Sequence, residues 1–159
     1  MDKITTEKIQ KLHPQLIDEV REIYTEICNN LNKGVICRFS HTYRSNAEQN
    51  ELYFKRPKVT NAKGGQSYHN YGLAIDIVLL IDKDNNGTYE TASWDNKIDI
   101  DKDGQSDWME VVKIFKSYGW EWGGDWKFLD TPHFQKTKGK TIKDLQRLTN
   151  NLGGVKYIL

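Results

Sequence analysis

The first fifth of the chain repeats apolar residues at helical spacing. From residue 6 to residue 31 an apolar side chain recurs every three or four positions. These side chains are Ile9, Leu12, Leu16, Val20, Ile23 and Ile27. Such a stripe is typical of an amphipathic helix that packs one face against a core. With Thr6 as its N-cap and Gly34 just beyond its end, the pattern predicts one helix over residues 6–31.

Strand-like patterns follow. Residues 35–42 predict one strand, and the run Ala-Ile-Asp-Ile-Val-Leu-Leu-Ile-Asp at 74–82 predicts a second, largely buried strand. Period-two alternation places Ala74 and Asp76 on the face opposite Ile75. Further helices are predicted after a Ser45 cap, over residues 109–118 and from residue 141 onward. The mixture predicts an α+β fold, a small antiparallel sheet with helices packed on one face.

Length and composition narrow the class of protein. The 159 residues fit a single domain, 1–159, and we expect a monomer. A net charge of +1 without a Lys/Arg cluster argues against nucleic acid as a partner. No apolar run is long enough to span a membrane, and residues 1–7 lack the apolar core of a signal peptide, so we expect synthesis in the cytosol. Cys28 and Cys37 are expected to be free and buried.

The main chemical feature is a carboxylate within an apolar run, accompanied by two histidines. Asp76 lies in the predicted buried strand, where a charge is costly unless it is paired or bound to a metal. Gly72 lets the chain turn so that His69 can fold back over this strand. His133 lies in the segment Asp-Thr-Pro-His-Phe at 130–134. Together His69, Asp76 and His133 provide the three N/O ligands of a catalytic zinc site, and Asp130 is placed to accept a proton from bound water.

Taken singly, each of these residues has an ordinary alternative. The alternative is that His69 and His133 are ordinary surface or core histidines and that Asp76 caps a turn. The combination favours a metal site, because all of the residues would otherwise have to coincide by chance.

Two motifs carry a family resemblance. Ser-x-His-x-x-Gly-x-Ala-x-Asp at 67–76 and Asp-x-Pro-His-Phe at 130–134 resemble the D-alanyl-D-alanine carboxypeptidase and L-alanyl-D-glutamate endopeptidase family of zinc peptidases. The stretch Trp-Glu-Trp-Gly-Gly-Asp-Trp at 120–126 is similar to the L-alanyl-D-glutamate branch, which includes phage endolysins and autolysins. The resemblance covers about residues 38–135. It implies a fold like that of hedgehog proteins and D-Ala-D-Ala peptidases, and an activity on the short peptides of bacterial cell walls.

The resemblance also implies roles for individual residues. His69, Asp76 and His133 match the zinc ligands, and Asp130 matches the acidic general base. Arg44 matches the arginine that steadies the substrate carbonyl, although a surface arginine at a strand end is its ordinary alternative. The substrate-side positions of the family match Ser67 and Gln49. A solvent-exposed helical glutamine remains the alternative for Gln49.

The tryptophan-rich stretch before Asp130 has two interpretations. Trp120, Trp122 and Trp126 would line a groove for an extended peptide, or two of them would belong to the core of the sheet. We assign Trp126 to the substrate groove. Asp125 is a candidate to orient a ligand histidine from behind.

A second motif is independent of the first. Residues 99–110 satisfy the pattern D-x-D-x-D-G-x5-E of a twelve-residue calcium loop. The predicted calcium ligands are Asp99, Asp101, Asp103, Gln105 through its backbone carbonyl, Asp107 and the bidentate Glu110. Five carboxylates against the single Lys102 repel one another strongly without a cation. A solvated acidic loop is the alternative.

An upstream segment begins like the same loop. Residues 82–87 read Asp-Lys-Asp-Asn-Asn-Gly, but Ser93 at the twelfth position cannot bind calcium in a bidentate way. Glu90 at the ninth position would be a substitute. A simple acidic turn is favoured here over a second calcium site.

These features together predict a zinc- and calcium-binding peptidase of bacterial peptidoglycan. The L-alanyl-D-glutamate bond is the expected target, and calcium in the insertion at about 82–110 is expected to modulate activity. The alternatives are a D-Ala-D-Ala carboxypeptidase or dipeptidase, or a non-catalytic module that binds zinc and calcium. The protein is expected to wait in the cytoplasm until it is released to the wall.

Overall fold

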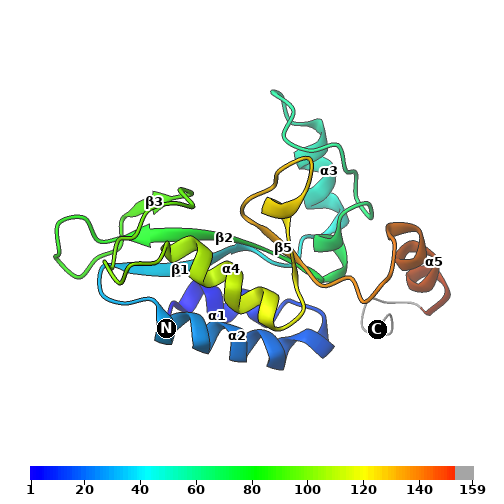
Figure 1. The fold of residues 1–159 in the computed structure, drawn as a ribbon. Helices are drawn as coiled ribbons and strands as arrows, with labels where there is room; N and C mark the ends of the chain where they lie inside the picture. Colours follow the sequence, from blue (N-terminus) through cyan, green and yellow to red (C-terminus); the bar gives the residue numbers. More distant parts are fainter. Residues whose placement is uncertain (153–159) are drawn as a thin grey trace.

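Helices and a small antiparallel sheet make up residues 1–152, the part of the chain that the computed structural model describes (Figure 1). The helices are α1 (Lys3–Ile9), α2 (Ile17–Asn30), α3 (Asn46–Phe54), α4 (Asp107–Ser117) and α5 (Ile142–Leu152), with the 3-10 turns η1 (Pro14–Leu16), η2 (Tyr68–Tyr71) and η3 (Gly123–Asp125). The strands are β1 (Val35–His41), β2 (Ala74–Ile81), β3 (Thr91–Ser93), β4 (Glu121–Trp122) and β5 (His133–Gln135). The predicted α+β class is confirmed.

Strand β2 is the centre of the sheet. It pairs with β1 along one edge and with β3 and β5 along the other, all antiparallel, and β4 continues the sheet beyond β5. The first half of β2 pairs with β5 and the second half with β3. The strand bearing Asp76 therefore lies directly beside the strand bearing His133, although the two residues are far apart in the sequence.

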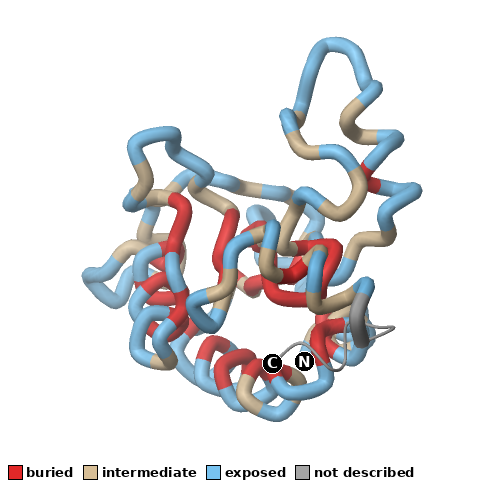
Figure 2. The backbone as a smooth tube through the Cα atoms, turned by 90° about the vertical axis from the view of Figure 1, so that its right-hand side faces the viewer, coloured by how far each residue is buried: buried red, intermediate tan, exposed pale blue. Residues whose placement is uncertain are grey.

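One face of the sheet is buried under helices. The opposite face, which carries the side chain of Asp76, is called the working face below. In Figure 1, α1, α2 and α4 lie together on one side of the sheet, whereas α3 rises on the other side. The burial colours in Figure 2 follow this division, because α3 and the loop after it, the highest part of Figure 1, are largely exposed. On the helix-covered side Ile75, Ile77 and Phe134 are fully buried, and Phe134 stacks on Phe115 of α4 at 4.2 Å between centroids.

The predicted single helix over residues 6–31 is wrong, because the chain forms α1, η1 and α2 there instead. Pro14 has no backbone N–H to donate and restricts His13 to an extended conformation, so a continuous helix cannot pass this point. The N-cap of α1 is Asp2, whose carboxylate accepts from the backbone N–H of Thr5, and not Thr6. The apolar stripe nevertheless faces the core as predicted, since all six of its residues are buried.

The remaining predicted elements agree with the structure to within a few residues. The helix after Ser45 is α3, and the Ser45 hydroxyl accepts from Glu48 N at 3.1 Å. The helix expected over 109–118 is α4, which begins two residues earlier at Asp107. The final helix expected from residue 141 is α5. Residues 153–159 of the expected single domain lie outside the described part.

Among residues 1–152, none of the helices combines the length and the apolar character needed to cross a membrane.

Both cysteines are free, as expected. Cys37 is buried in the core, but the prediction of burial is wrong for Cys28, which is exposed on α2.

A tight turn at Gly72 brings His69 over β2. Gly72 ends η2 in the left-handed conformation, with φ at +69°, and its N–H is bonded back to His69 O. The Gly72 carbonyl accepts from His13 N at 3.0 Å, and a Cβ at this position would collide with the His13 backbone. Glycine is therefore needed here for both its conformation and its size.

Replacing Gly72 by Ala should destabilise the fold more than the same change at Gly119. Gly119 has φ at +83° but nothing within 4 Å of an added Cβ, so Gly119→Ala should cost only the left-handed penalty of about 1–2 kcal/mol. Gly72→Ala should add a steric cost of about 1–3 kcal/mol. Urea unfolding of both variants measures the difference, and equal losses would contradict the close packing at Gly72.

Candidate metal centre

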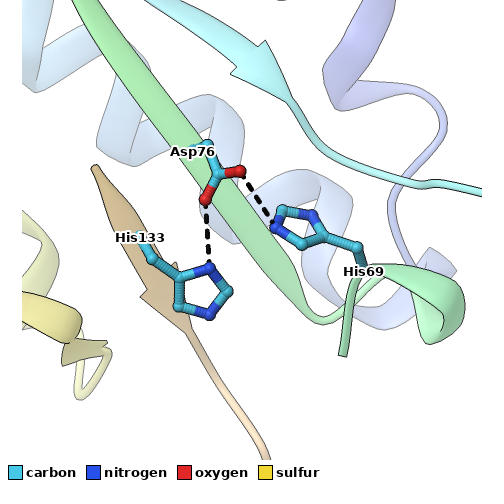
Figure 3. Close-up of side chains that lie close together, drawn as sticks. All are labelled: His69, Asp76 and His133. Atoms are coloured by element: carbon cyan, nitrogen blue, oxygen red, sulfur yellow. Dashed lines mark hydrogen bonds and ion pairs between the residues drawn. The ribbon is translucent and has the colours of Figure 1, made fainter. Parts of the chain in front are cut away.

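Three side chains from separate segments converge on the working face of the sheet, as Figure 3 shows. Asp76 comes from β2, His69 from η2 and His133 from β5. Asp76 Oδ2 lies 3.2 Å from His69 Nε2, and Asp76 Oδ1 lies 3.0 Å from His133 Nδ1. One possible ligand atom from each residue lies within 4.8 Å of the others. The structure thus brings together the three side chains that the sequence predicts as zinc ligands.

The outer nitrogen of each imidazole faces an acceptor. His69 Nδ1 lies 2.7 Å from the carbonyl oxygen of Thr42, and His133 Nε2 lies 2.9 Å from Gln135 Oε1. Because these oxygens only accept, each outer nitrogen carries the hydrogen, and the inner nitrogen of a neutral ring then offers a lone pair. Two lone pairs and a carboxylate therefore point at one place, where they repel unless a proton or a cation lies between them. This donor set fits a zinc ion.

The electrostatics of Asp76 follow from this arrangement. Burial alone would raise its pKa, but the hydrogen bonds from His133 and His69 and the charge on these rings outweigh burial and hold the pKa below its usual value. The pKa of His133 is raised: burial is the largest single effect and lowers it, but the hydrogen bond to Asp76, the Asp76 charge, the hydrogen bond to Gln135 and the Asp130 charge together outweigh burial. The carboxylate therefore remains ionised and attracts a positive charge to its two oxygens.

An open cavity of about 320 Å³ surrounds these three residues. Asp130 lies in its wall, with Oδ2 3.9 Å from His133 Nδ1 and a side chain that is 54% exposed. Burial raises the pKa of Asp130 above its usual value and the Asp76 charge adds to this, while His133 and His69 offset part of the increase. A carboxylate with a raised pKa, in contact with solvent and beside the metal position, is suited to accept a proton from water.

Arg44 and Gln49 form a second wall of the same cavity. The Arg44 side chain is only 13% exposed, its Nη2 lies 4.0 Å from Asp76 Oδ2, and its Nη1 donates to Gln49 Oε1 at 2.9 Å. Gln49 is 1% exposed and donates to Ala62 O, so the alternative of a solvent-exposed glutamine is wrong. Arg44 is likewise not a free surface arginine. Ser67 also lines the cavity, and its hydroxyl accepts from His69 N at 3.3 Å.

The tryptophans divide between core and site. Trp120 and Trp122 are buried in the hydrophobic core, as their alternative interpretation stated. Trp126 is partly exposed, and its ring lies 5.4 Å from that of His133 between centroids. The prediction that Asp125 orients a ligand histidine is wrong, because Asp125 forms an ion pair with Lys116 at 2.6 Å. The side chain behind His133 is Gln135.

The predicted calcium loop gathers its carboxylates. Asp99, Asp101 and Asp107 offer oxygens within 4.8 Å of one another, and Asp101, Asp103 and Glu110 do the same. Asp107 is fully buried and Glu110 is 7% exposed. Asp107 Oδ1 and Glu110 Oε2 have no hydrogen-bond partner among residues 1–152.

The charges in this loop are poorly compensated. Burial, followed by repulsion from Asp103 and Asp101, raises the pKa of Glu110 to about 7. Burial also raises the pKa of Asp107. Buried carboxylate oxygens without a partner are costly, and a cation among them would remove that cost.

The upstream acidic segment differs in this respect. Asp82, Asp84 and Glu90 also lie within 4.8 Å of one another, but Asp84 and Glu90 are exposed. The Asp82 carboxylate accepts from the backbone N–H groups of Asn86 and Gly87. Its oxygens are satisfied within the turn, which agrees with the preference for a simple acidic turn.

Several residues at the site had no signal in the sequence. His41 lines the cavity, and its Nδ1 lies 3.8 Å from Asp76 Oδ2. The Thr42 carbonyl and the Gln135 side chain contact the rings of His69 and His133. Only the register of β1, β2 and β5 brings these groups to the site, and register is not readable from one sequence. The alternation of β5, with His133 and Gln135 on one face, was the one usable clue.

Comparison with known proteins agrees with this geometry. A sequence profile of the family described as D-alanyl-D-alanine carboxypeptidase matches residues 60–136, which include His69, Asp76, Asp130 and His133 but not Arg44. The chain is 49% identical over 110 residues to the peptidoglycan L-alanyl-D-glutamate endopeptidase CwlK of Bacillus subtilis strain 168. That alignment covers 65% of this chain and 62% of the relative, so the chain spans less than two thirds of the relative's length.

Zinc binding should require His133 but not His41. His133→Ala removes one of the three converging ligands and should reduce bound zinc from one ion per chain to a trace, because a two-ligand site holds zinc weakly. The control is His41→Ala, which removes an exposed histidine beside Asp76 that is outside the three-residue group. Elemental analysis after dialysis measures both. Retention of zinc by the His133→Ala protein would refute the assignment.

Proposed function

We propose that the chain is a zinc peptidase of bacterial peptidoglycan and a member of the family described as D-alanyl-D-alanine carboxypeptidase, whose profile matches residues 60–136. The bond we propose as its target is the one between L-alanine and D-glutamate in the stem peptide. The activity for which the 49% identical relative is named, that of a peptidoglycan L-alanyl-D-glutamate endopeptidase, supports this choice of bond. The observation that carries the proposal is the convergence of two imidazole lone pairs and the Asp76 carboxylate in the wall of an open cavity.

In the proposed site His69, Asp76 and His133 hold the metal ion. Zinc, when bound, lowers the pKa of a coordinated water towards about 7 and polarises the scissile carbonyl. Asp130 then accepts the proton of the attacking water and passes it to the leaving amine of D-glutamate. Because Asp130 is partly exposed, it would reach both the attacking water and the leaving amine. Asp76, held between two histidines, would bind only the metal.

Arg44 is the proposed electrostatic partner of the substrate. Its guanidinium is fixed by Gln49 and directed into the cavity, where it would stabilise negative charge that develops on the carbonyl oxygen. The same residue would not be needed by a module that only binds zinc. Asp130 and Arg44 in one cavity with the metal position therefore favour an enzyme over a non-catalytic module. Ser67, Gln49 and Trp126 are proposed to border the substrate.

A D-Ala-D-Ala carboxypeptidase or dipeptidase is the second candidate within the family. The description of the matching profile favours it, and the Arg44 charge could hold a terminal carboxylate as well as an oxyanion. The two candidates differ in their products, and this difference decides between them.

The protein is proposed to be a monomer with one catalytic domain, made in the cytosol and released to the wall.

We also propose that residues 99–110 bind calcium and that calcium supports the peptidase site. Asp107 and Glu110 carry the buried, unpartnered oxygens, and Asp99, Asp101 and Asp103 supply further carboxylates. Gln105 would contribute its backbone carbonyl. The insertion at about 82–110 ends in α4, whose Phe115 stacks on Phe134 beside His133. Calcium would thus order α4, the helix that packs against β5.

Digestion of purified peptidoglycan tests the proposed bond. Zinc-loaded protein should produce fragments with a new D-glutamate amino terminus, which mass spectrometry with amino-terminal labelling detects. Released D-alanine without that terminus would favour the carboxypeptidase instead.

The same assay tests the role of Asp130, with a matched control at Asp125. Asp130→Asn should retain zinc and lower the rate by about 100- to 10,000-fold, because only proton transfer is lost. Asp125→Asn, a matched change at an exposed aspartate paired with Lys116, should digest at the normal rate. Full activity of the Asp130→Asn protein would remove Asp130 from the mechanism.

Calcium should stabilise the protein and raise its activity. At a calcium concentration one hundred times the dissociation constant, binding adds about 2.7 kcal/mol to the free energy of unfolding. Thermal unfolding and hydrolysis by zinc-loaded protein, each with and without calcium, measure the two effects. Glu110→Gln should abolish both, whereas Glu90→Gln in the upstream turn should leave them intact. Identical melting temperatures and rates with and without calcium would contradict the proposal.

A further inference from the structure

We propose that Gln135 and Glu121 are positioning residues that fix the metal-binding orientation of His133, an inference that rests on the proposed zinc site. His133 Nε2 is 2.9 Å from Gln135 Oε1, and Gln135 Nε2 donates to Glu121 Oε2 at 2.8 Å. The three side chains form a chain of hydrogen bonds that leads away from the metal position. Its far end is a carboxylate at the edge of the sheet.

The sheet builds this chain through its register. His133 and Gln135 are two residues apart on β5, so their side chains share one face. Glu121 of β4 is the direct partner of Gln135 across the strand pair. On the other side of β5, Gln135 pairs with Ala74 of β2, whose small side chain leaves room for the amide. Gln135 is 9% exposed, so its amide has little water to bond instead.

The direction of the Gln135 amide follows from chemistry and does not depend on how the oxygen and nitrogen are assigned. An ionised carboxylate can only accept, so Glu121 selects the NH2 group of Gln135. The amide oxygen must then face His133 Nε2, which consequently carries a hydrogen. The reversed amide would place its oxygen against the carboxylate, and two acceptors would face each other. Glu121 therefore sets the tautomer of His133 through Gln135, leaving the Nδ1 lone pair for the metal.

The two ligand histidines are thus held by different means. His69 Nδ1 donates to a backbone carbonyl, that of Thr42, which side-chain substitution cannot remove. His133 depends on two side chains that are not themselves ligands. Hydrogen bonds of this kind orient the ring and raise its basicity. Substitutions at Gln135 and Glu121 should therefore weaken metal binding without removing any ligand.

Zinc affinity, measured by competition with a chromophoric chelator, tests the inference directly. Gln135→Met keeps the length and burial of the side chain but removes both hydrogen bonds, and should weaken zinc binding by about 10- to 100-fold. Glu121→Gln can accept or donate, so it no longer fixes the amide direction, and a smaller loss that still exceeds twofold is expected. Gln10→Met and Glu22→Gln, the same changes at exposed positions, should have no effect.

A spectroscopic signal separates positioning from a general structural role. In the zinc-loaded wild type, the His133 Nε2 proton should give an exchange-protected NMR resonance with a contact to the Gln135 side chain. Gln135→Met should abolish its protection while the resonances of His69 remain unchanged. If Gln135→Met does not fold, the exposed Glu121→Gln decides by the same two measurements.

The outcomes distinguish this inference from the proposed function. Wild-type affinity in both Gln135→Met and Glu121→Gln, within twofold, would overturn the positioning role while zinc binding and peptidoglycan digestion stand. A wild-type protein that binds no zinc would overturn both. Weakened binding in the two variants, with normal binding in the two controls, establishes Gln135 and Glu121 as the support of His133.

Discussion

The structure depends on one charged group placed inside a sheet. Asp76 lies on β2, the central strand, and each of its oxygens faces the inner nitrogen of one imidazole. A carboxylate in such surroundings is costly unless positive charge compensates it. The outer nitrogens of both rings are tied to acceptors, so neither ring can turn its hydrogen inward without losing that bond. The fold therefore creates a point where a cation is strongly favoured.

Strand alternation lets one sheet provide both the core and the chemistry. On β5, His133 and Gln135 face the site while Phe134 between them is fully buried against Phe115. On β2, Asp76 lies between Ile75 and Ile77, both fully buried on the other face. The alternation joins the stability of the site to that of the core, because a shift of one residue in register would exchange the two faces. Side chains that must be mobile or accessible, such as Asp130, lie on loops outside this alternation.

Most of the fold and the central site could be predicted from the sequence, and the failures have identifiable causes. The apolar run at 74–82, the α+β class and the convergence of His69, Asp76 and His133 followed from local pattern and from a resemblance in short motifs. The prediction of one helix over residues 6–31 failed because it followed the apolar periodicity and gave too little weight to Pro14. This proline interrupts the helical backbone but leaves the apolar stripe intact. The prediction for Asp125 failed because the sequence does not show where its side chain points, and in the structure its carboxylate pairs with Lys116. Gln135 and Glu121 were missed because the cross-strand pairing that brings them together is a property of the folded sheet.

The connection between β2 and β5 explains how a second cation would support the proposed zinc site. About fifty residues separate the two strands, and closing a flexible loop of that length carries an entropic cost that grows as about 1.5 RT ln n. Strand β5 has only three residues, so its own ladder cannot hold it firmly against β2. The stacking of Phe134 on Phe115 transfers that task to α4, the one long helix in the connection. Helix α4 in turn begins at Asp107 and carries Glu110, the two residues with buried, unpartnered oxygens. A cation bound there would neutralise the first turn of the helix that holds His133 in place, so the order of the proposed zinc ligands would depend on the occupancy of the acidic loop.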